Sequence, residues 1–427
     1  MRGATSAAVQ QQARRIGGPG DLLTEDQIRG FVRDSLDSAE LDGLSVCLVV
    51  PDGTRSCPLP LLIDEIHRCL TGRVTKLTAI IALGTHAEMD EQQLARHLGH
   101  EAGGLAERYP GLVLLNHAWW DPATFASLGT IPGDRIEQIS GGLLSDGVQI
   151  RINRAVVEHD VALVIGPVFP HEVVGFSGGN KYFFPGVGGQ EIIDISHWLG
   201  ALITSADMIG MRGITPVRAL INEAASMIPA RKLALCVVTA SGRDDLHAVS
   251  FGDTDTAWSA AAEISAESHV TYLDAPVSRV LSIMPTMYDD IWTAAKGFYK
   301  LEPVVADGGE VIIYAPHVTQ ISRMHPEIME IGYHCRDYFI QQWDTFKHLP
   351  WGVLAHSTHV RGAGTYDQVT GEQPRVKVTL ATGIPRETVN AVGLDYLDPD
   401  EVEIEAYESD GETLVVPNAG ELLFRLR

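Results

Sequence analysis

Short apolar runs rich in β-branched residues recur along this chain and are separated by amphipathic segments. The apolar runs cover residues 44–50, 77–83, 111–116, 162–166, 233–238, 279–284 and 310–315. Runs of this length and composition, bounded by glycine, proline and polar residues, predict β-strands. The segments 89–103 and 255–268 place apolar residues at helical spacing and predict helices. Alternation of the two kinds is typical of an α/β protein with largely parallel sheets.

The strand–helix alternation restarts near residue 275, which predicts a second domain. A chain of 427 residues also exceeds the size at which one hydrophobic core usually stops growing. We therefore expect a flexible leader over 1–20, an N-terminal α/β domain over 21–274 and a C-terminal α/β domain over 275–427. The active site is expected in the cleft between the two domains. A late run at 375–381 is assigned to the second domain, whereas the last segment, 413–427, could join either domain.

Composition, charge and missing motifs narrow the class of protein. Apolar residues make up 45% of the chain and charged residues 20%, as in soluble globular proteins. The net charge of -23 disfavours a nucleic-acid surface, because phosphates would be repelled. No apolar run reaches the roughly 18 residues that a membrane span needs, and the opening residues lack the apolar core of a secretory signal. No Walker, H-E-x-x-H or G-x-S-x-G motif is present.

Cysteine usage points to the cellular compartment. The five cysteines are scattered and form no C-x-x-C pair. This pattern argues against a disulfide framework and against a structural zinc site. A reducing cytoplasm is therefore the expected location.

The segment between His171 and His197, HEVVGFSGGNKYFFPGVGGQEIIDISH, combines residue types that bind anions with residue types that transfer protons. Its turn, Ser177-Gly178-Gly179, lets backbone N–H groups approach an anion closely, with the serine hydroxyl as a further donor. Lys181 could supply a positive charge or an amine for a covalent bond. A glycine-rich surface loop flanked by histidines is the simpler interpretation, but the segment follows an apolar strand and not a polar linker.

Candidate functional residues also follow four of the predicted strands. Arg55, His86, His117 and His171 each come shortly after an apolar run. Because the carboxyl ends of parallel strands line the ligand crevice of an open α/β sheet, these side chains are expected to share one rim. They favour a small anionic substrate with proton transfer, for which His86 and His171 are the natural acid–base pair. His197 could be a core histidine or a metal ligand, and a cofactor would then have to supply the other ligands.

The chain resembles the nickel-pincer lactate racemase family over most of its length. The resemblance is carried by Asp52-Gly53-Thr54-Arg55, Gly84-Thr85-His86, Asn116-His117, His171, Ser177-Gly178-Gly179-Asn180-Lys181, Phe184-Pro185-Gly186 and His197. In that family the lysine anchors a pyridinium-3,5-bisthiocarboxylic acid mononucleotide that carries nickel, and a histidine completes the square around the metal. The resemblance implies that Lys181 is the covalent anchor and that His197 binds Ni(II), a metal that suits square-planar sites. It further implies cofactor contacts from Asp52, Ser177, Gly178 and Gly179.

The same resemblance implies a racemase or epimerase that inverts C2 of a 2-hydroxy acid by hydride transfer to and from the cofactor. His86 and His171 would exchange the hydroxyl proton on opposite faces of the cofactor. Arg55 would clamp the substrate carboxylate with its bidentate fork. The simpler alternative for Arg55 is a surface ion pair with Asp52. Enzymes that make the cofactor would be the accessory partners, with no nucleic-acid or membrane partner.

The predicted second domain departs from the family. Lys296 matches a lysine expected near the substrate, but Trp292-Thr293 replaces the tyrosine–glutamine pair that precedes it in the lactate enzymes. We therefore expect Trp292, Thr293 and Lys296 to contact a substrate other than lactate, such as malate or another larger 2-hydroxy acid. A dicarboxylate would need a further cation, and the sequence offers three candidates: His317, Arg336 and Arg361.

Two other function classes fit the same residues. One is a metal-assisted lyase or dehydratase that acts on a hydroxy acid without hydride transfer. The other is a non-catalytic protein that carries the cofactor. The presence of two acid–base histidines disfavours the second of these, because storage would not need them.

Overall fold

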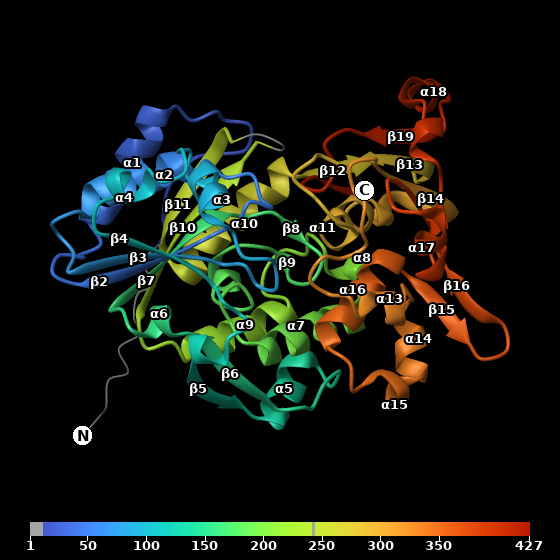
Figure 1. Ribbon diagram of the computed structural model, residues 1–427, viewed down its shortest axis with the longest axis horizontal. Helices are drawn as coiled ribbons and strands as arrows, with labels where there is room; N and C mark the ends of the chain where they lie inside the picture. Colours follow the sequence, from blue (N-terminus) through green and yellow to red (C-terminus); the bar gives the residue numbers. More distant parts are fainter. Residues whose placement is uncertain (1–11, 241–243) are drawn as a thin grey trace.

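The computed structural model describes residues 12–240 and 244–427 of the chain. A seven-stranded sheet has the strand order β1-β11-β10-β7-β2-β3-β4, and a five-stranded sheet has the order β18-β17-β14-β13-β19 (Figure 1). Helices flank both sheets, so the α/β class expected from the sequence is confirmed. Residues 1–11 of the expected leader lie outside the described residues.

Parallel strands form the body of the seven-stranded sheet. They are β2 (Ser45–Val50), β3 (Lys76–Ile81), β4 (Leu112–Asn116), β7 (Val161–Pro167) and β10 (Arg231–Thr239). These are the five strands that the apolar runs before residue 275 predict. On the β10 side, β11 (Leu246–Asp253) and β1 (Arg14–Gly17) add antiparallel strands. Because β1 pairs with β11, a flexible leader that extends to residue 20 is wrong.

The direction in which the sheet grows reverses between β2 and β7, which lie side by side. From β2 the sheet continues through β3 and β4, and from β7 it continues through β10. In open α/β sheets the ligand crevice lies outside the carboxyl ends of the strands at such a reversal. The segments after β2, β3 and β7 carry Arg55, His86 and His171, so the topology itself directs them toward one place.

Two apolar layers cover the faces of this sheet. Side chains that alternate along β2, such as Leu48 and Val49, belong to different layers, because successive residues of a strand point to opposite faces. One layer includes α1 (Glu25–Asp37) and α2 (Leu59–Leu70). The other includes α7 (Gln190–Ile203), α9 (Pro216–Ser226) and α10 (Thr254–Ser268). This second layer continues into the five-stranded sheet, so one core joins the two sheets.

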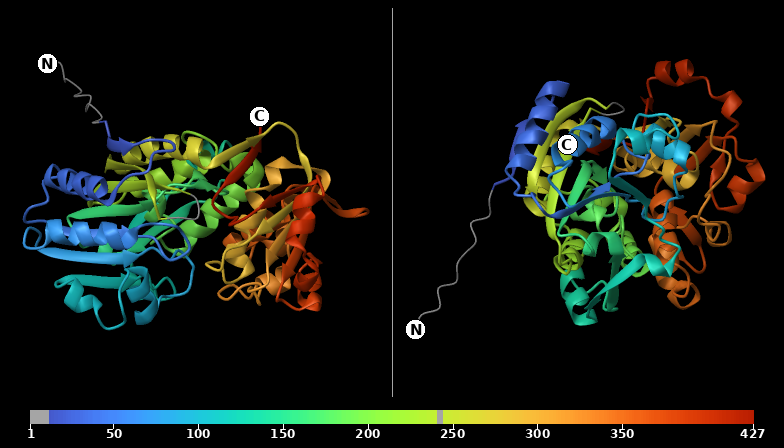
Figure 2. Two further views of the ribbon diagram at one scale, coloured as in Figure 1. Left: turned by 90° about the horizontal axis from the view of Figure 1, so that it is seen from above. Right: turned by 60° about the vertical axis from the view of Figure 1, so that its left-hand side comes forward.

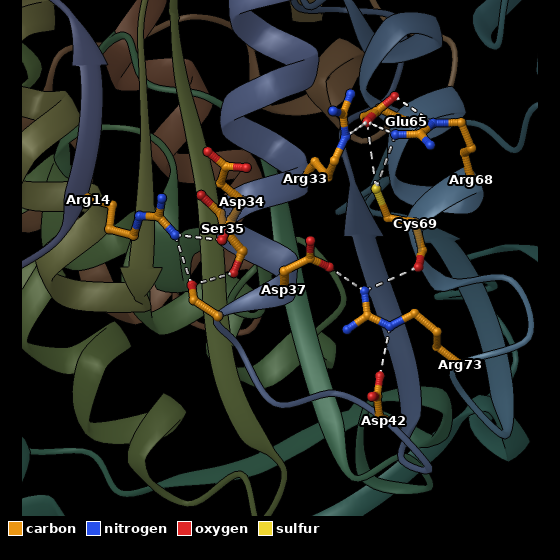
Figure 3. A network of polar contacts seen from close by, with 11 residues as sticks. Arg14, Arg33, Asp34, Ser35, Asp37, Asp42, Glu65, Arg68, Cys69 and Arg73 are labelled. Carbon is orange, nitrogen blue, oxygen red and sulfur yellow. Dashed lines mark hydrogen bonds and ion pairs between the residues drawn. The ribbon is translucent and has the colours of Figure 1, made fainter.

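A polar network ties α1 and α2 together on the outside of the molecule (Figure 3). Glu65 in α2 is only 2% exposed and accepts two hydrogen bonds from Arg68. Arg73, just after α2, forms ion pairs with Asp37 (2.6 Å) and Asp42 (2.7 Å). None of these residues lines the cavity described below, so the network supports the fold alone.

Every strand pair of the five-stranded sheet is parallel. Its strands are β13 (Val277–Ile283), β14 (Val305–Ala315), β17 (Lys377–Thr382), β18 (Asp395–Tyr396) and β19 (Thr413–Val416). The predicted strands after residue 275 are among them. Helix α16 (Trp351–Arg361) packs along α7, which brings the two halves of the chain into contact. Figure 2 shows the halves side by side.

The last segment, whose sheet the sequence left open, divides between two places. Its first part is β19 of the five-stranded sheet, whereas β20 (Leu423–Leu426) pairs in parallel with β12 (Val270–Leu273), just after α10. The chain thus returns to the end of its first half (Figure 2).

The expected helix over 89–103 is shorter in the structure, where α3 spans Glu91–His97.

The remaining elements are short. The β-strands and 3-10 helices are β5 (Phe125–Ile131), β6 (Val148–Asn153), β8 (Pro170–His171), β9 (Gly175–Phe176), β15 (Gly364–Asp367), β16 (Gly371–Pro374), η1 (Pro122–Thr124), η2 (Gly179–Tyr182), η3 (Glu302–Val304) and η4 (Pro399–Glu401). The α-helices are α4 (Leu105–Arg108), α5 (Gly133–Ser140), α6 (Arg154–Val157), α8 (Ser205–Met208), α11 (Ile291–Ala294), α12 (Lys296–Tyr299), α13 (Ile328–Ile331), α14 (Arg336–Gln341), α15 (Trp343–Phe346), α17 (Arg386–Ala391) and α18 (Ile404–Ser409). No helix within 12–240 or 244–427 is long and apolar enough to cross a membrane.

A buried arginine braces the glycine-rich turn that follows β9. Arg218 in α9 is 1% exposed, and its guanidinium donates hydrogen bonds to the carbonyl oxygens of Gly178 (3.0 Å) and Phe176. The same guanidinium lies 4.2 Å from the ring centre of Trp258, whose Nε1 donates to the carbonyl oxygen of Ser177 (2.8 Å). These contacts satisfy backbone carbonyls that a turn in the protein interior would otherwise leave unpaired.

We predict that Arg218→Met lowers the free energy of unfolding by about 1–3 kcal/mol, because the buried carbonyl oxygen of Phe176 loses its donor and that of Gly178 keeps only the N–H of Lys181 (3.3 Å). Urea unfolding of the cofactor-free protein, followed by circular dichroism, measures the change. Arg135→Met is the matched control, since the Arg135 side chain is 41% exposed in its ion pair with Glu223. That control should change the free energy of unfolding far less, because an exposed ion pair contributes little to stability. Equal losses in the two variants would contradict the bracing role.

Candidate active site

A cavity of about 520 Å³ lies at the carboxyl ends of β2, β3 and β7 and extends to α16. Ten of the twelve site residues expected from the sequence line it. They are Asp52, Arg55, His86, His171, Ser177, Gly178, Lys181, His197, Trp292 and Lys296. Residues of the first half and of the second half therefore face the same space, although up to 244 positions (from Asp52 to Lys296) separate them in sequence.

Two of the expected site residues do not line the cavity. Thr293 lies in α11, where its hydroxyl donates to Oδ1 of Asp290 (2.9 Å), so it serves the start of that helix and not the substrate. Gly179 has a φ of +57°, and a Cβ there would lie 2.8 Å from Cβ of Trp258. Its N–H points to the buried sulfur of Cys236, so the expected role of this glycine at a phosphate is not supported.

His117 is not on the rim, contrary to expectation. It is fully buried, with Nε2 3.2 Å from the carbonyl oxygen of Gly188 and Nδ1 3.2 Å from Nδ2 of Asn153. Burial lowers its pKa to about 4. The strand before it, β4, is the last strand of the sheet and lies away from the reversal between β2 and β7. His117 is a core histidine that supports the loop before α7.

The cations expected for a second carboxylate also lie elsewhere. His317, Arg336 and Arg361 are all absent from the cavity lining. His317 contacts the carbonyl oxygen of Tyr288 at 3.0 Å, and Arg336 donates to the carbonyl oxygen of Leu202 at 2.9 Å. All three are therefore wrong as candidates for a substrate contact in this cavity.

His86 and Asp52 form a close pair at the ends of neighbouring strands. Nδ1 of His86 lies 2.5 Å from Oδ2 of Asp52, whose other oxygen accepts from the hydroxyl of Thr54 (2.7 Å). Burial opposes the charge on Asp52, but the imidazole and the Thr54 hydrogen bonds hold the pKa of that carboxyl well below its usual value. When the carboxylate accepts a proton from Nδ1, the lone pair of the neutral ring is on Nε2. His86 is thus arranged as a base.

His171 is buried in the short strand β8. The N–H of Val173 donates to its Nδ1 (3.1 Å), and Oε2 of Glu172 lies 3.3 Å from the same nitrogen. Burial, followed by the nearby charges of Lys181 and Arg55, holds the pKa of His171 well below its usual value. Each of the two candidate acid–base histidines therefore has a carboxylate beside it.

Lys181 follows the glycine-rich turn in the 3-10 helix η2. Burial and the adjacent Arg55 lower its pKa to about 8, so an appreciable share of its amine is uncharged and nucleophilic near neutral pH. Gly178 has a φ of +84°, a conformation that favours glycine. The hydroxyl of Ser177 accepts from the N–H of Phe169 (2.9 Å), so it shapes the turn as well as lining the cavity.

His197 lies in α7 with Nδ1 2.7 Å from the carbonyl oxygen of Ile193. This contact fixes the proton on Nδ1 and leaves Nε2 as an electron-pair donor, the arrangement found at histidine metal ligands. Burial, with Lys181 nearby, lowers the pKa of His197 to about 4, so the ring is uncharged near neutral pH. Among the described residues, no three His, Cys, Asp or Glu side chains are grouped to hold a metal ion. A metal bound here would need other ligands from a cofactor.

Arg55 provides positive charge on the cavity wall, and burial, followed by this charge, holds the pKa of the neighbouring Lys296 well below its usual value. Lys296 is 6% exposed and lies 4.7 Å from the ring centre of Tyr288. Trp292 is stacked between His325 and His356, with ring centres 3.9 Å apart on each side. A wall of three stacked aromatic rings therefore borders the space beside these two side chains.

Several cavity residues were missed by the sequence reading. They are Trp119, Glu172, Tyr299, His325, His348, His356 and His359. Glu172 adjoins His171 in the sequence, so its position was a signal that could have been used. His356 and His359 are three residues apart on α16, a spacing that puts two side chains on one face of a helix. For the others, nothing in the local sequence distinguishes a cavity residue from a core residue.

The sequence is similar to those of known proteins. Residues 28–209 match the sequence model of the lactate racemase N-terminal domain. The chain is 26% identical to lactate racemase from Thermoanaerobacterium thermosaccharolyticum over 186 residues, which are 42% of this chain and 39% of that one. It is 22% identical to lactate racemase from Lactiplantibacillus plantarum over 286 residues, which are 66% of this chain and 62% of that one. The matches thus span less than two thirds of either relative.

Two solved structures share the fold. A crystal structure of a protein from Thermotoga maritima superposes with a TM-score of 0.87 at 32% identity and covers 96% of this chain and 100% of that one. The lactate racemase apoprotein from T. thermosaccharolyticum superposes with a TM-score of 0.70 at 18% identity, with coverages of 96% and 100%. At that identity the second likeness concerns the fold alone.

We predict that Lys181 of the cofactor-free protein reacts with a trace of acetic anhydride along a pH curve with its midpoint near 8, the pH to which burial and Arg55 bring its pKa. An unperturbed lysine would give a midpoint near about 10.4. Mass spectrometry of the digested protein gives the curve for each lysine. Arg55→Met removes a like charge, so it should move the Lys181 midpoint upward. A midpoint above 10 in the unaltered protein would contradict this picture of the site.

Proposed function

Because this chain belongs to the lactate racemase family, we propose that it is an isomerase that inverts C2 of a 2-hydroxy acid. The observation that carries the proposal is the meeting of two histidines, each beside a carboxylate, with Arg55, Lys181 and His197 around one cavity. Two acid–base groups in one pocket with Arg55 suit a reaction that removes and returns a hydroxyl proton at one carbon.

The residues present fit a nickel pincer nucleotide as cofactor. Lys181 offers an amine with a lowered pKa for the covalent attachment. His197 offers an uncharged Nε2 to Ni(II) while its other nitrogen is held by the backbone. The turn at Ser177 and Gly178 borders the same cavity and would receive the phosphate. When bound, this cofactor would accept the C2 hydrogen as hydride and return it.

The chain's own residues then have separate tasks. Arg55 and Lys296 bind the carboxylate, and the fork of Arg55 fixes its orientation. His86 takes the hydroxyl proton at Nε2 while Asp52 holds Nδ1. His171 supplies or takes the proton on the other face. Burial of the site keeps water from competing for these protons.

The substrate pocket supports a 2-hydroxy acid other than lactate. Trp292 and its flanking imidazoles form a broad wall where a C3 substituent would lie. Among the described residues that line the cavity, the Lys and Arg side chains are Arg55, Lys181 and Lys296, and each already has a task. A second carboxylate would have to share one of them, so malate is a less suitable substrate than a 2-hydroxy acid with an uncharged side chain.

We expect protein co-produced with the cofactor-making enzymes to carry a mass adduct on Lys181 and to remove the optical rotation of at least one single-enantiomer 2-hydroxy acid. A panel that includes lactate and malate, analysed by chiral chromatography, identifies the substrate. An active preparation with an unmodified Lys181 would contradict the cofactor assignment. Loss of water from a hydroxy acid without inversion would favour the lyase class instead.

Single substitutions in the enzyme that carries the cofactor distinguish the tasks of His86 and His197. His86→Ala should lower kcat by about 10²–10⁴-fold, the usual contribution of a general acid or base, with nickel still bound. His197→Ala should lose nickel and keep the adduct on Lys181. His67→Ala, in α2 and outside the cavity lining, is the control for both measurements. Nickel content by elemental analysis and adduct mass together tell metal loss from cofactor loss.

A further inference from the structure

Nδ1 of His171 has two neighbours that favour opposite positions of its proton. The N–H of Val173 donates to this nitrogen at 3.1 Å, which requires a lone pair there. Oε2 of Glu172, 3.3 Å away, is an acceptor and would be satisfied by a proton on the same nitrogen. A neutral imidazole carries one proton, so each neighbour stabilises a different tautomer.

The tautomer decides what His171 can do for a substrate. With the lone pair on Nδ1, the proton is on Nε2, and Nε2 cannot accept another from a hydroxyl group. With the proton on Nδ1, Nε2 is free to take the hydroxyl proton, and the resulting imidazolium needs an acceptor beside Nδ1. The amide of Val173 cannot be that acceptor, because it is itself a donor.

We propose that Glu172 is a positioning residue that places the proton of His171 on Nδ1 and so makes Nε2 the atom that exchanges protons with the substrate. The proposal rests on the proposed function, in which His171 is one of the two acid–base groups. When the substrate O–H bond breaks, its proton forms the N–H bond at Nε2. The proton on Nδ1 stays on the ring and hydrogen-bonds to Glu172, which remains a carboxylate, and the return transfer reverses the same bonds.

The surroundings of His171 explain why a carboxylate is needed. The other groups that act on its charge are basic or titratable: Lys181, Arg55, His197 and Lys300. Each of them opposes a positive charge on the ring, as does burial. Glu172 is the carboxylate in direct contact with Nδ1, so it is the group that offsets this repulsion when the imidazolium forms.

Glu172 is itself held in the ionised state. Burial acts against its charge, but His359, its own backbone N–H, Lys181 and Arg55 lower the pKa of this carboxyl. The hydroxyl of Tyr299, in α12, also hydrogen-bonds to Glu172. A carboxylate that stays charged and is fixed by a phenol can hold the imidazole proton in one place.

The pair of His171 and Glu172 differs from the pair of His86 and Asp52 in the same cavity. Asp52 lies 2.5 Å from Nδ1 of His86 and sets its tautomer directly. At His171 the amide of Val173 competes with Glu172 for the same nitrogen. Loss of the carboxylate should therefore invert the tautomer of His171, an effect that a merely structural role would not produce.

The test compares Glu172→Gln with the unaltered protein by ¹⁵N NMR of the imidazole rings, with the cofactor-free protein as the sample. In the unaltered protein the proton of His171 should lie on Nδ1. In Glu172→Gln it should move to Nε2, and the pH at which the imidazolium forms should fall by about one unit or more, a tenfold loss of proton affinity. Tyr299→Phe should shift the same signals in the same direction by less, and it serves if Glu172→Gln does not fold.

The loaded enzyme provides a second measurement. Because the imidazolium of His171 is lost at lower pH in Glu172→Gln, the alkaline limb of its kcat profile should move to lower pH, and kcat at its optimum should fall by about tenfold or more. Glu172→Asp should restore part of both. Glu223→Gln removes a carboxylate from an exposed ion pair and should change neither readout.

The outcomes distinguish a failure of the role proposed for Glu172 from a failure of the proposed reaction. An identical tautomer and titration of His171 in Glu172→Gln and in the unaltered protein would overturn the role of Glu172, whatever the activity does. A drop in activity that is the same at every pH, with unchanged NMR signals, would do so too. If the loaded enzyme inverts no 2-hydroxy acid while the NMR shift depends on Glu172, the proposed reaction fails and the positioning role stands.

Discussion

Basic and acidic side chains share a cavity wall in the protein interior, and removing them from water is costly unless they compensate one another. Arg55, Lys181 and Lys296 face Asp52 and Glu172 there. Burial and the neighbouring Arg55 lower the pKa of both lysines. This favours the uncharged amines and so limits the positive charge of the cluster. The same shifts leave amines and imidazoles uncharged near neutral pH, which is the state needed for covalent attachment, metal ligation and proton transfer. The burial that makes these charges costly is therefore also what sets the protonation states that the proposed chemistry needs.

These side chains can be buried together because the direction in which the seven-stranded sheet grows reverses between β2 and β7. That reversal opens a crevice at the strand ends, and the turn after β9 closes one side of it, held by the guanidinium of Arg218. Helix α16 covers the other side because it packs along α7. The site therefore requires both halves of the chain, and the side chains of α16 and α12 complete what the first half begins.

The sequence predicted the parts of the structure that depend on local pattern. The apolar runs gave the parallel strands, and the rule for strand ends placed Arg55, His86 and His171 together. The rule failed at His117, because whether a strand end borders the crevice depends on the order of strands in the sheet, which the sequence does not state. Thr293 was assigned to the substrate by motif position, yet its hydroxyl donates to Asp290, whose carboxylate caps α11. The spacing of His356 and His359 puts them on one face of α16, but that this face borders the cavity depends on the packing of α16 along α7, which the local sequence does not show.

The pairing of β12 with β20 has a mechanical consequence. The chain leaves the first half after β12, returns to it between β19 and β20, and then pairs β20 in parallel with β12. Two covalent crossings therefore join the halves, and a displacement of one half relative to the other must be accommodated by both of them. Just before β20, Glu421 accepts a hydrogen bond from the N–H of Ser56 (3.1 Å), next to Arg55. The returning crossing thus contacts the loop that carries Arg55 on the cavity wall.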